Sequence, residues 1–297
     1  MSERVTKELS ARGISFAEGE PLAKHSSFRI GGSACLAVFP ASESELLFAL
    51  DLLQEENPLV VGRGSNLVFP DGDFVRPVIF TEGLRQITVD GTRIEAGAGA
   101  PLTALCKAAC EASLAGLAFA YGIPGSVGGG IYMNAGAYGG ELGSLCSSVR
   151  YYDRREKRIK TIDGDACAFA YRHSFFADHK DCVILSATFS LSPGNREKIE
   201  AEMRDFLDRR KASQPLEFPS AGSAFRRPVG AYAGRLIEDC GLKGASVGGA
   251  QVSEKHAGFI VNRGGAAAED VRALVKQIQK TVLEQTGFDL ECEIEFL

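Results

Sequence analysis

The sequence predicts an α+β protein, and three observations favour that class over a regular alternation of strands and helices. Short β-rich runs fill the middle of the chain with few helical patterns between them. A charged amphipathic helix is expected over 196–211, directly after the turn sequence at 193–195. A second long helical pattern covers 267–285 and ends at Gly287. Strands and helices that cluster in this way are typical of α+β folds, whereas a doubly wound sheet would alternate them.

The first hundred residues predict short strands, a helix and a hairpin. One strand ends at Pro40, and Ser42 with Glu45 forms a capping box that starts a helix. The run 58–69 contains two glycines in its middle, which predicts strand, tight loop, strand. Apolar residues alternate on both sides of Asp90-Gly91, which predicts a β-hairpin.

Further elements follow from the same patterns along the rest of the chain. Pro101 is well placed in the first turn of a helix. Additional strands are expected over 149–153, 157–162, 182–191 and 258–262, and a short helix over 232–240. The terminal segment 288–297 alternates with period two, which predicts a strand whose apolar residues face the core and whose glutamates face the other way.

Composition indicates an ordinary globular protein. The 297 residues are 45% hydrophobic and 24% charged, and no apolar run has membrane-spanning length. The polar first residues, MSERVTKELSARG, resemble neither a signal peptide nor an anchor, so we expect a cytoplasmic protein with no membrane partner. The net charge of −5 argues against a nonspecific nucleic-acid binder, which needs a basic field. The eight cysteines form no CxxC pair, so reduced buried thiols are expected rather than a metal site.

The chemically suggestive stretch is the glycine-rich segment Tyr121–Glu141. Glycine weakens helices and strands, so such density indicates close approach of the backbone to another body, either a ligand or a neighbouring domain. A second loop, GRGSNL at 62–67, places two glycines, a hydroxyl and an amide between strands. Neither GxGxxG nor GxxxxGK[ST] is present, so the Rossmann and P-loop readings lose their usual support. Two separate donor-rich loops suit a large ligand such as a dinucleotide.

Seven ordered motifs resemble one family, UDP-N-acetylenolpyruvoylglucosamine reductase, over nearly the whole chain. They are HSSFRIGG (25–32), GRGSNLVF (62–69), GIPGSVGGGIYMNAGAYGGE (122–141), YRHSFF (171–176), PSAGSAFRRP (219–228), KHAGFIVN (255–262) and ECEIEF (291–296). The resemblance is to the shorter subgroup, because the span after Arg172 lacks a tyrosine-bearing insertion.

The resemblance implies a vanillyl-alcohol-oxidase-like FAD-binding module in two parts, 1–72 and 73–193, followed by an α+β substrate-binding domain at 194–297. It implies noncovalent FAD, NADPH as reductant, and reduction of a UDP-sugar enolpyruvyl ether to UDP-N-acetylmuramate for peptidoglycan synthesis. A role in cell wall biogenesis, cell shape, cell division and the cell cycle would follow. A monomer is expected.

Three residues match the family's catalytic positions. Arg172 would stabilise charge on the enolpyruvyl carboxylate, although from YRHSFF alone a solvated arginine beside aromatic residues is the commoner outcome. Ser223 would protonate C2 of the substrate, although serine in a small-residue loop is more often a turn cap. Glu293 would assist that protonation, and only the resemblance separates it from Glu291 and Glu295.

The binding residues implied by the resemblance fall into two sets. The cofactor-binding set is Gly62, Arg63, Gly64, Ser65, Asn66, Leu67, Gly122, Ile123, Pro124, Gly125, Ser126, Gly128, Gly129, Asn134, Gly136 and Ala137. The substrate-binding set is Arg210, Lys211, Arg226, Arg227 and His256. The family commonly has a lysine where this chain has Ser213, so the cation that meets the diphosphate is left open.

Other functions remain open from the sequence alone. A related FAD oxidoreductase with another substrate would keep the glycine-rich loops but not the catalytic set. A nucleotide-sugar-binding protein without catalysis and a cofactor-free scaffold are the alternatives from other classes. Bound flavin excludes the scaffold, and NADPH oxidation that depends on the enolpyruvyl substrate distinguishes the reductase from the rest.

Overall fold

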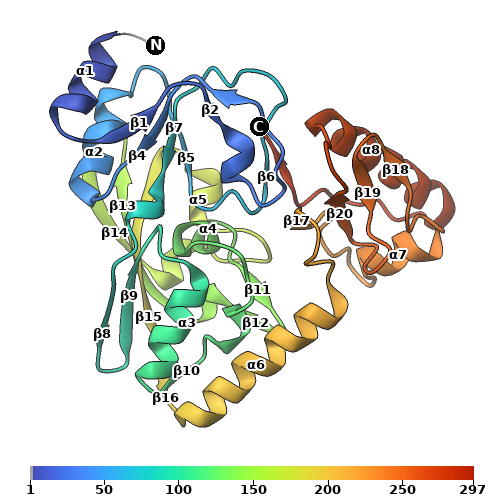
Figure 1. Ribbon diagram of the computed structural model, residues 1–297. Coiled ribbons are helices and arrows are strands. Elements are labelled where there is room, and N and C mark those ends of the chain that lie inside the picture. The colour runs from blue at the N-terminus through green and yellow to red at the C-terminus, as the bar shows by residue number, and fades with distance from the viewer. Residues whose placement is uncertain (1–2) are drawn as a thin grey trace. The chain divides into compact units, whose positions relative to one another are not determined.

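The computed structural model describes residues 3–297 and divides the chain into two compact units. Unit 1 contains Met1–Glu18, Leu36–Arg63 and Arg76–Arg209. Unit 2 contains Gly19–Cys35, Gly64–Val75 and Arg210–Leu297. Both units mix helices with short strands, so the predicted α+β class is confirmed (Figure 1). Each unit takes segments from distant parts of the sequence.

The largest sheet of unit 1 has five antiparallel strands in the order β14-β13-β15-β9-β8. Their bounds are Ile87–Asp90 (β8), Arg93–Gly97 (β9), Cys146–Asp153 (β13), Arg158–Asp163 (β14) and Cys182–Ser190 (β15). The strands β8 and β9 form the hairpin predicted around Asp90-Gly91, and Gly91 has a φ of 56° in its turn. The strands expected over 149–153, 157–162 and 182–191 are confirmed as β13, β14 and β15.

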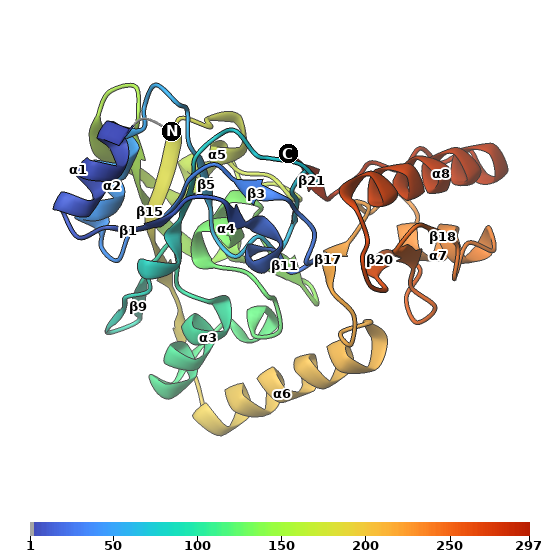
Figure 2. The ribbon, with the colours of Figure 1, turned by 45° about the horizontal axis from the view of Figure 1, so that its top comes forward.

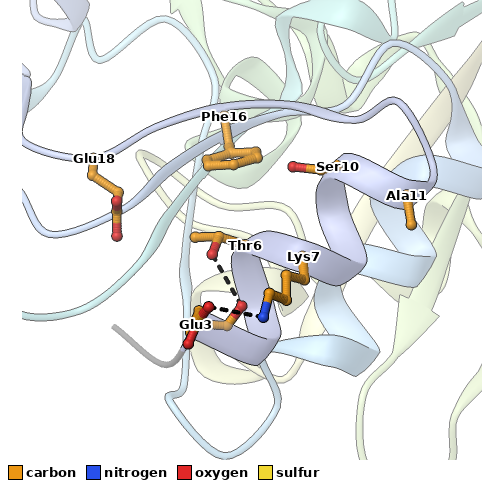
Figure 3. A pocket seen from close by; sticks show the side chains of 7 residues that line it. All are labelled: Glu3, Thr6, Lys7, Ser10, Ala11, Phe16 and Glu18. Atoms are coloured by element: carbon orange, nitrogen blue, oxygen red, sulfur yellow. Dashed lines mark hydrogen bonds and ion pairs between the residues drawn. The ribbon is translucent and has the colours of Figure 1, made fainter.

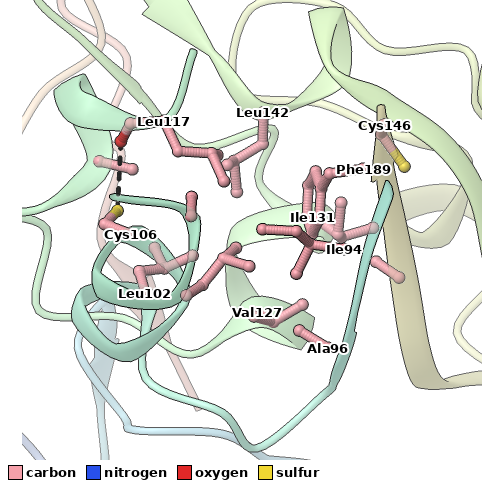
Figure 4. Close-up of a cluster of buried hydrophobic side chains, with 14 of the residues drawn as sticks. Ile94, Ala96, Leu102, Cys106, Leu117, Val127, Ile131, Leu142, Cys146 and Phe189 are labelled. Carbon is pink, nitrogen blue, oxygen red and sulfur yellow. Dashed lines mark hydrogen bonds between the residues drawn. The ribbon is translucent and has the colours of Figure 1, made fainter. Parts of the chain in front are cut away.

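The two faces of this sheet carry different side chains because successive residues of a strand point to opposite faces. On one face Tyr151 joins the hydrophobic core with α3 (Leu102–Glu111) and α4 (Val127–Tyr132). Figure 4 shows part of this core, in which Leu102 of α3 and Val127 of α4 lie near Phe189 of β15. On the opposite face Arg150 pairs with Glu43 of α2 (Glu43–Leu52), 3.0 Å apart. The sheet is therefore packed on one side and bound by polar contacts to a helix on the other.

A second sheet of unit 1 has the order β1-β4-β7-β5. Its strands are Ser15–Ala17 (β1), Ala37–Phe39 (β4), Leu59–Val61 (β5) and Val78–Phe80 (β7), and helix α2 covers Glu43–Leu52. Ser42 caps α2 as predicted, since its Oγ accepts from the Glu45 N–H at 3.3 Å. The Glu45 carboxylate accepts from the N–H of Ala41 at 2.8 Å, one residue earlier than in a standard capping box.

Smaller elements complete unit 1. They are α1 (Glu3–Ala11), β10 (Leu114–Ala115), β11 (Gly136–Ala137), β12 (Gly140–Glu141), α5 (Phe175–Asp178), β16 (Ser192–Pro193) and four 3₁₀ turns at Thr81–Gly83, Ala118–Ala120, Leu142–Ser144 and Gly164–Cys167. The predicted charged helix is α6 (Arg196–Ser213), whose last residues belong to unit 2.

Unit 2 is built on a four-stranded antiparallel sheet with the order β17-β20-β19-β18. Its strands are Ser220–Ser223 (β17), Ser246–Val247 (β18), Ala250–Val252 (β19) and Phe259–Asn262 (β20). Helix α8 (Ala268–Thr286) packs on β18 and β19 and contacts α7 (Ala233–Asp239). Figure 2 shows α8 beside β18 and α7. Gly287 ends α8 with a φ of 76°, the left-handed cap that its position predicted.

Two segments from the N-terminal quarter of the chain belong to unit 2. One contains β2 (Glu20–Pro21), a 3₁₀ turn at Leu22–His25 and β3 (Ser33–Ala34); the other contains β6 (Leu67–Val68). The strand β6 pairs in parallel with β21 (Glu295–Phe296) at the C-terminus. Phe28, Ile30 and Val68 lie in the same hydrophobic cluster as α8, so both segments share the core of unit 2.

Two expectations about local structure are wrong. The segment 288–297 is not one strand, because only β21 and an isolated bridge at Cys292 are paired. Its period-two pattern comes from alternate burial of an extended segment, with Leu290 and Ile294 fully inside. The glycine-rich stretch was expected as loop, yet it contains α4, which begins after a capping serine and is covered by the core.

Candidate active site

The glycine-rich stretch is built around α4 and its capping residue Ser126. The Ser126 side chain is 1% exposed and accepts from the N–H of Gly129 at 3.3 Å. Gly128 and Gly130 are closely packed, since a Cβ would lie 3.0 Å from the Ala98 side chain or 2.7 Å from a terminal methyl of Leu142, and these neighbours would have to shift. Much of this glycine therefore serves close approach within unit 1.

The two loops expected to hold a cofactor meet at Gly62 and Ser126. A Cβ on Gly62 would lie 2.2 Å from the Ser126 Oγ, closer than any side chain allows. The first loop comes from the end of β5 and the second from the start of α4, and both of these residues belong to unit 1. Their contact brings together two cofactor-binding candidates that are distant in the sequence.

The rest of the first loop, Gly64 to Leu67, belongs to unit 2, and the carbonyl groups of Gly64 and Ser65 face Ser27. The carbonyl of Gly64 accepts from the Ser27 N–H at 3.3 Å, and that of Ser65 lies 3.4 Å from the Ser27 Oγ. In a trans peptide the N–H of the next residue points opposite to the carbonyl. The N–H groups of Ser65 and Asn66 therefore point away from Ser27.

Arg172 lies in a tight turn of unit 1 with a positive φ of 55°. Its Nη2 lies 3.5 Å from the carbonyl oxygen of Gly136, and its guanidinium lies 5.0 Å from the centre of the Tyr171 ring. The turn is held to the glycine-rich stretch on both sides, because Asn134 donates to the Ala170 carbonyl and Ser174 donates to the Tyr132 carbonyl. Arg172 thus occupies a defined position beside β11.

Several cofactor-binding candidates in this stretch are used within the protein. Asn134 is 1% exposed, and its amide group bonds to Glu141, Ala170 and the N–H of Gly143. Gly125 is buried, and its carbonyl accepts from the Leu102 N–H at 3.0 Å. The partly or fully exposed candidates of unit 1 are Gly62, Arg63, Gly122, Ile123, Pro124, Gly128, Gly129, Gly136 and Ala137.

Ser223 and Glu293 are brought together in unit 2. Gly222, with a φ of 78°, lies in an irregularity of β17 that shifts its register against β20 and leaves Ser223 exposed. The N–H of Glu293 donates to the carbonyl of Ala224 at 2.9 Å, so the Glu293 main chain lies next to the residue after Ser223. Arg172 belongs to the other unit.

His256 occupies a half-buried position in the turn before β20. Its Nδ1 accepts from the Gly258 N–H at 3.1 Å, and its ring makes an edge contact with Phe259. Burial lowers the pKa of His256 below the ordinary value. A neutral imidazole whose Nδ1 accepts that bond carries its proton on Nε2.

The four cationic candidates, Arg210, Lys211, Arg226 and Arg227, differ in the interactions that they make within the protein. Arg226 forms an ion pair with Glu291 at 2.9 Å, and the Arg227 guanidinium lies 4.0 Å from the centre of the Tyr232 ring. Arg210 and Lys211 lie in the last turn of α6, where the Lys211 carbonyl accepts from the Lys255 Nζ at 2.6 Å. Part of the positive charge of this set is therefore neutralised by the chain itself.

Sequence reasoning missed the roles of Ser27 and Asn262. Asn262 is 7% exposed, donates to the Phe28 carbonyl at 3.1 Å, and accepts from Gly264 and Ala266. Ser27 donates to the Ser220 carbonyl at 2.7 Å. The motifs HSSFRIGG and KHAGFIVN contained these residues, but no local pattern shows that the two motifs touch.

Other features of the described chain do not add to the site. Within residues 3–297, no helix is long and apolar enough to cross a membrane, and no group of three or more His, Cys, Asp or Glu residues could hold a metal. Burial raises the pKa of Cys106 to about 12, which keeps this thiol neutral. The pocket in Figure 3 lies beside α1 and is lined by none of the candidate residues.

Comparison with known proteins identifies two domains in the chain. A family model described as FAD binding domain matches residues 34–161. A second, described as UDP-N-acetylenolpyruvoylglucosamine reductase, C-terminal domain, matches residues 214–297. Together the two matches show a cofactor-binding domain followed by a domain characteristic of one enzyme family.

Relatives and a solved structure agree with the domain matches. The UDP-N-acetylenolpyruvoylglucosamine reductase of Lactiplantibacillus plantarum is 43% identical over 99% of this chain and 98% of its own length. That of Caldicellulosiruptor bescii is 44% identical over 97% and 93%. The crystal structure of the Thermus caldophilus enzyme superposes with a TM-score of 0.79 at 31% identity, covering 95% of this chain and 98% of that one. The resemblance carried by the seven motifs is confirmed, and the chain belongs to the UDP-N-acetylenolpyruvoylglucosamine reductase family.

Proposed function

We propose that this protein is an FAD-containing, NADPH-dependent enzyme that reduces the enolpyruvyl ether of UDP-N-acetylglucosamine enolpyruvate to UDP-N-acetylmuramate. The observation that carries the proposal is identity of 43% to a reductase of this name over 99% of the chain. The match of an FAD binding domain to residues 34–161 supports the cofactor. The product is a precursor of peptidoglycan, so the enzyme serves cell wall synthesis and, through it, cell shape and division.

The residues of the cofactor loops fit a ligand that contains a diphosphate. The N–H groups of Ser65 and Asn66 point away from Ser27, because the carbonyls of Gly64 and Ser65 face it. Successive N–H groups that point the same way form an anion-binding nest. The contact between Gly62 and Ser126 leaves no room for a side chain at the start of this loop. Residues 62–67 and 122–137 would hold FAD.

Bound FAD supplies the chemistry that side chains lack, carrying a hydride equivalent from NADPH to C3 of the enolpyruvyl group. The protein's part is to stabilise charge and to deliver a proton. Arg172 is proposed to bind the enolpyruvyl carboxylate, on which negative charge grows as the hydride arrives. The restricted turn that contains Arg172 fixes the start of its side chain, which reduces the entropy lost when it binds.

Ser223 is proposed as the proton donor to C2, with Glu293 as its partner. A serine hydroxyl is a weak acid, so it can serve only a strongly basic carbanion-like intermediate and needs neighbours that stabilise the alkoxide. The N–H of Glu293 donates to the carbonyl of Ala224, the residue after Ser223. The backbone segments that contain Ser223 and Glu293 are therefore adjacent. Glu293 stabilises the intermediate or orders a proton-carrying water.

The UDP portion of the substrate is proposed to bind the cations of unit 2. Arg227 and Lys211 are exposed, whereas Arg226 must exchange or share its ion pair with Glu291. Arg210 lies half-buried at the end of α6, and His256 offers a neutral N–H donor. A cytoplasmic location and a monomeric state complete the proposal, with residues 1–193 as the FAD-binding module and 194–297 as the substrate-binding domain.

The proposal is tested by steady-state NADPH oxidation with the purified, flavin-containing protein. We expect oxidation that depends on the enolpyruvyl substrate and a product heavier than the substrate by two hydrogens, measured by mass spectrometry. Absence of bound flavin would contradict the FAD assignment. NADPH oxidation that ignores this substrate would favour an oxidoreductase with another substrate, and substrate binding without turnover would favour a non-catalytic binding protein.

A further inference from the structure

Asn66 of the cofactor loop is hydrogen-bonded to the main chain around Glu293. Its Nδ2 donates to the carbonyl of Glu293 at 2.9 Å, although the two residues are 227 positions apart. Its own carbonyl accepts from the N–H of Glu295 at 3.0 Å. The parallel pairing of β6 with β21 continues the same contact by two residues on each strand. Asn66 therefore holds the C-terminal segment on both sides of Ile294.

The opposite side of the Glu293 peptide is held by the segment that contains Ser223. The N–H of Glu293 donates to Ala224, and the N–H of Arg226 donates to the Glu291 carbonyl at 2.9 Å. Glu293 thus lies between the Ser223 segment and the cofactor loop, with its N–H committed to one and its carbonyl to the other. A shift of either neighbour displaces the residue.

Ser27 makes a second connection between the same two regions. Its N–H donates to Gly64 in the cofactor loop, and its Oγ donates to the Ser220 carbonyl at the start of β17 at 2.7 Å. All of these residues belong to unit 2. The cofactor loop is thereby joined to the strand that ends in Ser223 and to the segment that contains Glu293.

We propose that Asn66 is a positioning residue that couples occupancy of the cofactor loop to the placement of Glu293. This inference rests on the proposed function and adds a residue through which FAD binding orders the proton-delivering pair. A ligand that fixes the loop fixes the Asn66 amide, and the amide fixes the Glu293 carbonyl. Coupling of this kind is reciprocal, so order at the C-terminus must strengthen FAD binding by the same factor.

The amide group of Asn66 is needed for this contact, because its partner at Glu293 is a carbonyl oxygen, which can only accept a hydrogen bond. An amide donates to that oxygen, whereas a carboxylate of the same shape would place a second acceptor against it. Asn66→Asp therefore removes the donor without changing the size of the side chain. Asn66→Ser also removes it and adds no charge.

The chain provides a matched control in Gln279. Its Nε2 donates to the Leu290 carbonyl at 2.8 Å, which is also an amide-to-carbonyl bond that holds the C-terminal segment. Gln279 lies on α8, outside the cofactor loop and outside the proposed catalytic set. Gln279→Glu removes an equivalent donor from the same segment, but it leaves the Asn66 connection intact.

The experiment compares hydrogen–deuterium exchange of the flavin-stripped protein with and without added FAD. In the wild type and in Gln279→Glu, we expect FAD to slow amide exchange both in residues 62–67 and in residues 291–297. In Asn66→Asp, FAD should still protect 62–67 but no longer 291–297. Equal FAD-dependent protection of 291–297 in all three proteins would overturn the proposal.

Half-reaction kinetics give a second readout. With FAD at a saturating concentration, we expect Asn66→Asp to slow flavin reoxidation by the enolpyruvyl substrate roughly tenfold more than flavin reduction by NADPH, as coupling energies of this size predict. Equal slowing of both half-reactions, in this variant and in Gln279→Glu alike, would indicate a merely structural role and refute the inference. If Asn66→Asp does not fold, Asn66→Ser provides the same comparison.

The outcomes separate this inference from the proposed function. A wild-type protein that binds FAD and turns over the substrate without FAD-dependent protection of 291–297 refutes the coupling alone. A wild-type protein that binds no FAD refutes the proposed function together with the inference built on it.

Discussion

The two candidate regions of the molecule are assembled in opposite ways. The region around Arg172 is local: the bonds that hold its turn join residues 36 apart, in Asn134 to Ala170, and 42 apart, in Ser174 to Tyr132. The region around Ser223 and Glu293 is not, since Ser27 binds Ser220 across 193 residues and Asn66 binds Glu293 across 227. One region follows from a continuous stretch of sequence, and the other needs three distant segments of unit 2.

This difference should affect how well each region tolerates the loss of a single hydrogen bond. Closing a long loop has a larger entropic cost than closing a short one, although the cost grows only slowly with length. Long-range contacts must therefore be numerous or specific. Unit 2 has a shared core and the pairing of β6 with β21, but the side chains of Ser27 and Asn66 each form one specific bond to a distant carbonyl near the proposed catalytic pair. We expect the Arg172 region to tolerate the loss of one such bond and the Ser223 region to lose function with it.

The largest expected effect concerns proton delivery. Ser223→Ala removes the hydroxyl while Gly222 still shapes the bulge. Flavin reoxidation by substrate should slow by about 10²- to 10⁴-fold, the usual loss of a general acid, while flavin reduction by NADPH stays nearly unchanged. Stopped-flow absorbance of the flavin separates the two steps. Equal reoxidation rates in variant and wild type would remove Ser223 from the mechanism.

Arg172 should give the next largest effect. Arg172→Lys keeps the charge but loses the planar fork that matches a carboxylate, so reoxidation should slow by about 10²-fold, as for the loss of one charge-stabilising donor. Stability should hardly change, because the turn is held by Asn134 and Ser174. A urea unfolding curve alongside the kinetics makes the distinction, and a large loss of stability would contradict the local construction of this region.

Gly62 tests the contact between the two cofactor loops. Gly62→Ala places a Cβ 2.2 Å from the Ser126 Oγ, and strain from such overpacking should weaken FAD binding by about 10- to 100-fold. The double variant with Ser126→Ala should regain much of this loss, because the next atom, the Ser126 Cβ, lies at 3.4 Å. Fluorescence titration with FAD measures both. A double variant no better than Gly62→Ala would show that another contact is limiting.

Alanine substitutions of Ser174 and Ser27 allow a direct comparison of the Arg172 region with the Ser223 region. Ser174 and Ser27 each donate to a carbonyl at 2.7 Å, one in the local region and one in the long-range region. Replacing either with alanine should lower the free energy of unfolding by about 1 kcal/mol. Only Ser27→Ala should also weaken FAD binding, because the lost bond to Ser220 anchors the residue whose N–H contacts Gly64 of the cofactor loop. Equal FAD affinities in the two variants would remove the functional difference between the regions.

The smallest effect is a pH dependence at His256. Burial lowers the pKa of this histidine, so the unfolded chain takes up its proton at a higher pH than the folded chain. The stability associated with neutral His256 is full above the unfolded value of about 6.5 and is lost as pH falls toward the folded value. The urea midpoint of the wild type should be lower at pH 5.5 than at pH 8, and this difference should be smaller in His256→Gln. A difference of the same size in both proteins would contradict a lowered pKa for His256.

The sequence was most informative where structure is local. Capping at Ser42, the hairpin at Asp90-Gly91, and the helix that ends at Gly287 were predicted because each depends on neighbours within a few residues. The prediction of one strand over 288–297 was wrong, because the alternation at Leu290 and Ile294 reports burial without showing whether a partner strand exists along the whole segment.

For the candidate site, too, the sequence predicted local features but not contacts between distant segments. The motifs supplied the side chains, including Ser223 and Glu293, but nothing local indicates that Ser27 meets Ser220 or that Gly62 abuts Ser126. Such contacts depend on how distant segments pack, and the residue types involved, serine and glycine, are equally common in ordinary turns.

The central claim is that this protein passes reducing equivalents from NADPH to an enolpyruvyl UDP-sugar through bound FAD. Anaerobic stopped-flow absorbance of the wild-type flavoprotein tests it most directly. We expect NADPH alone to bleach the flavin, and we expect the enolpyruvyl substrate, added afterwards without oxygen, to restore the oxidised spectrum within a single turnover. A flavin that NADPH does not bleach, or that stays reduced in the presence of the substrate, would contradict it.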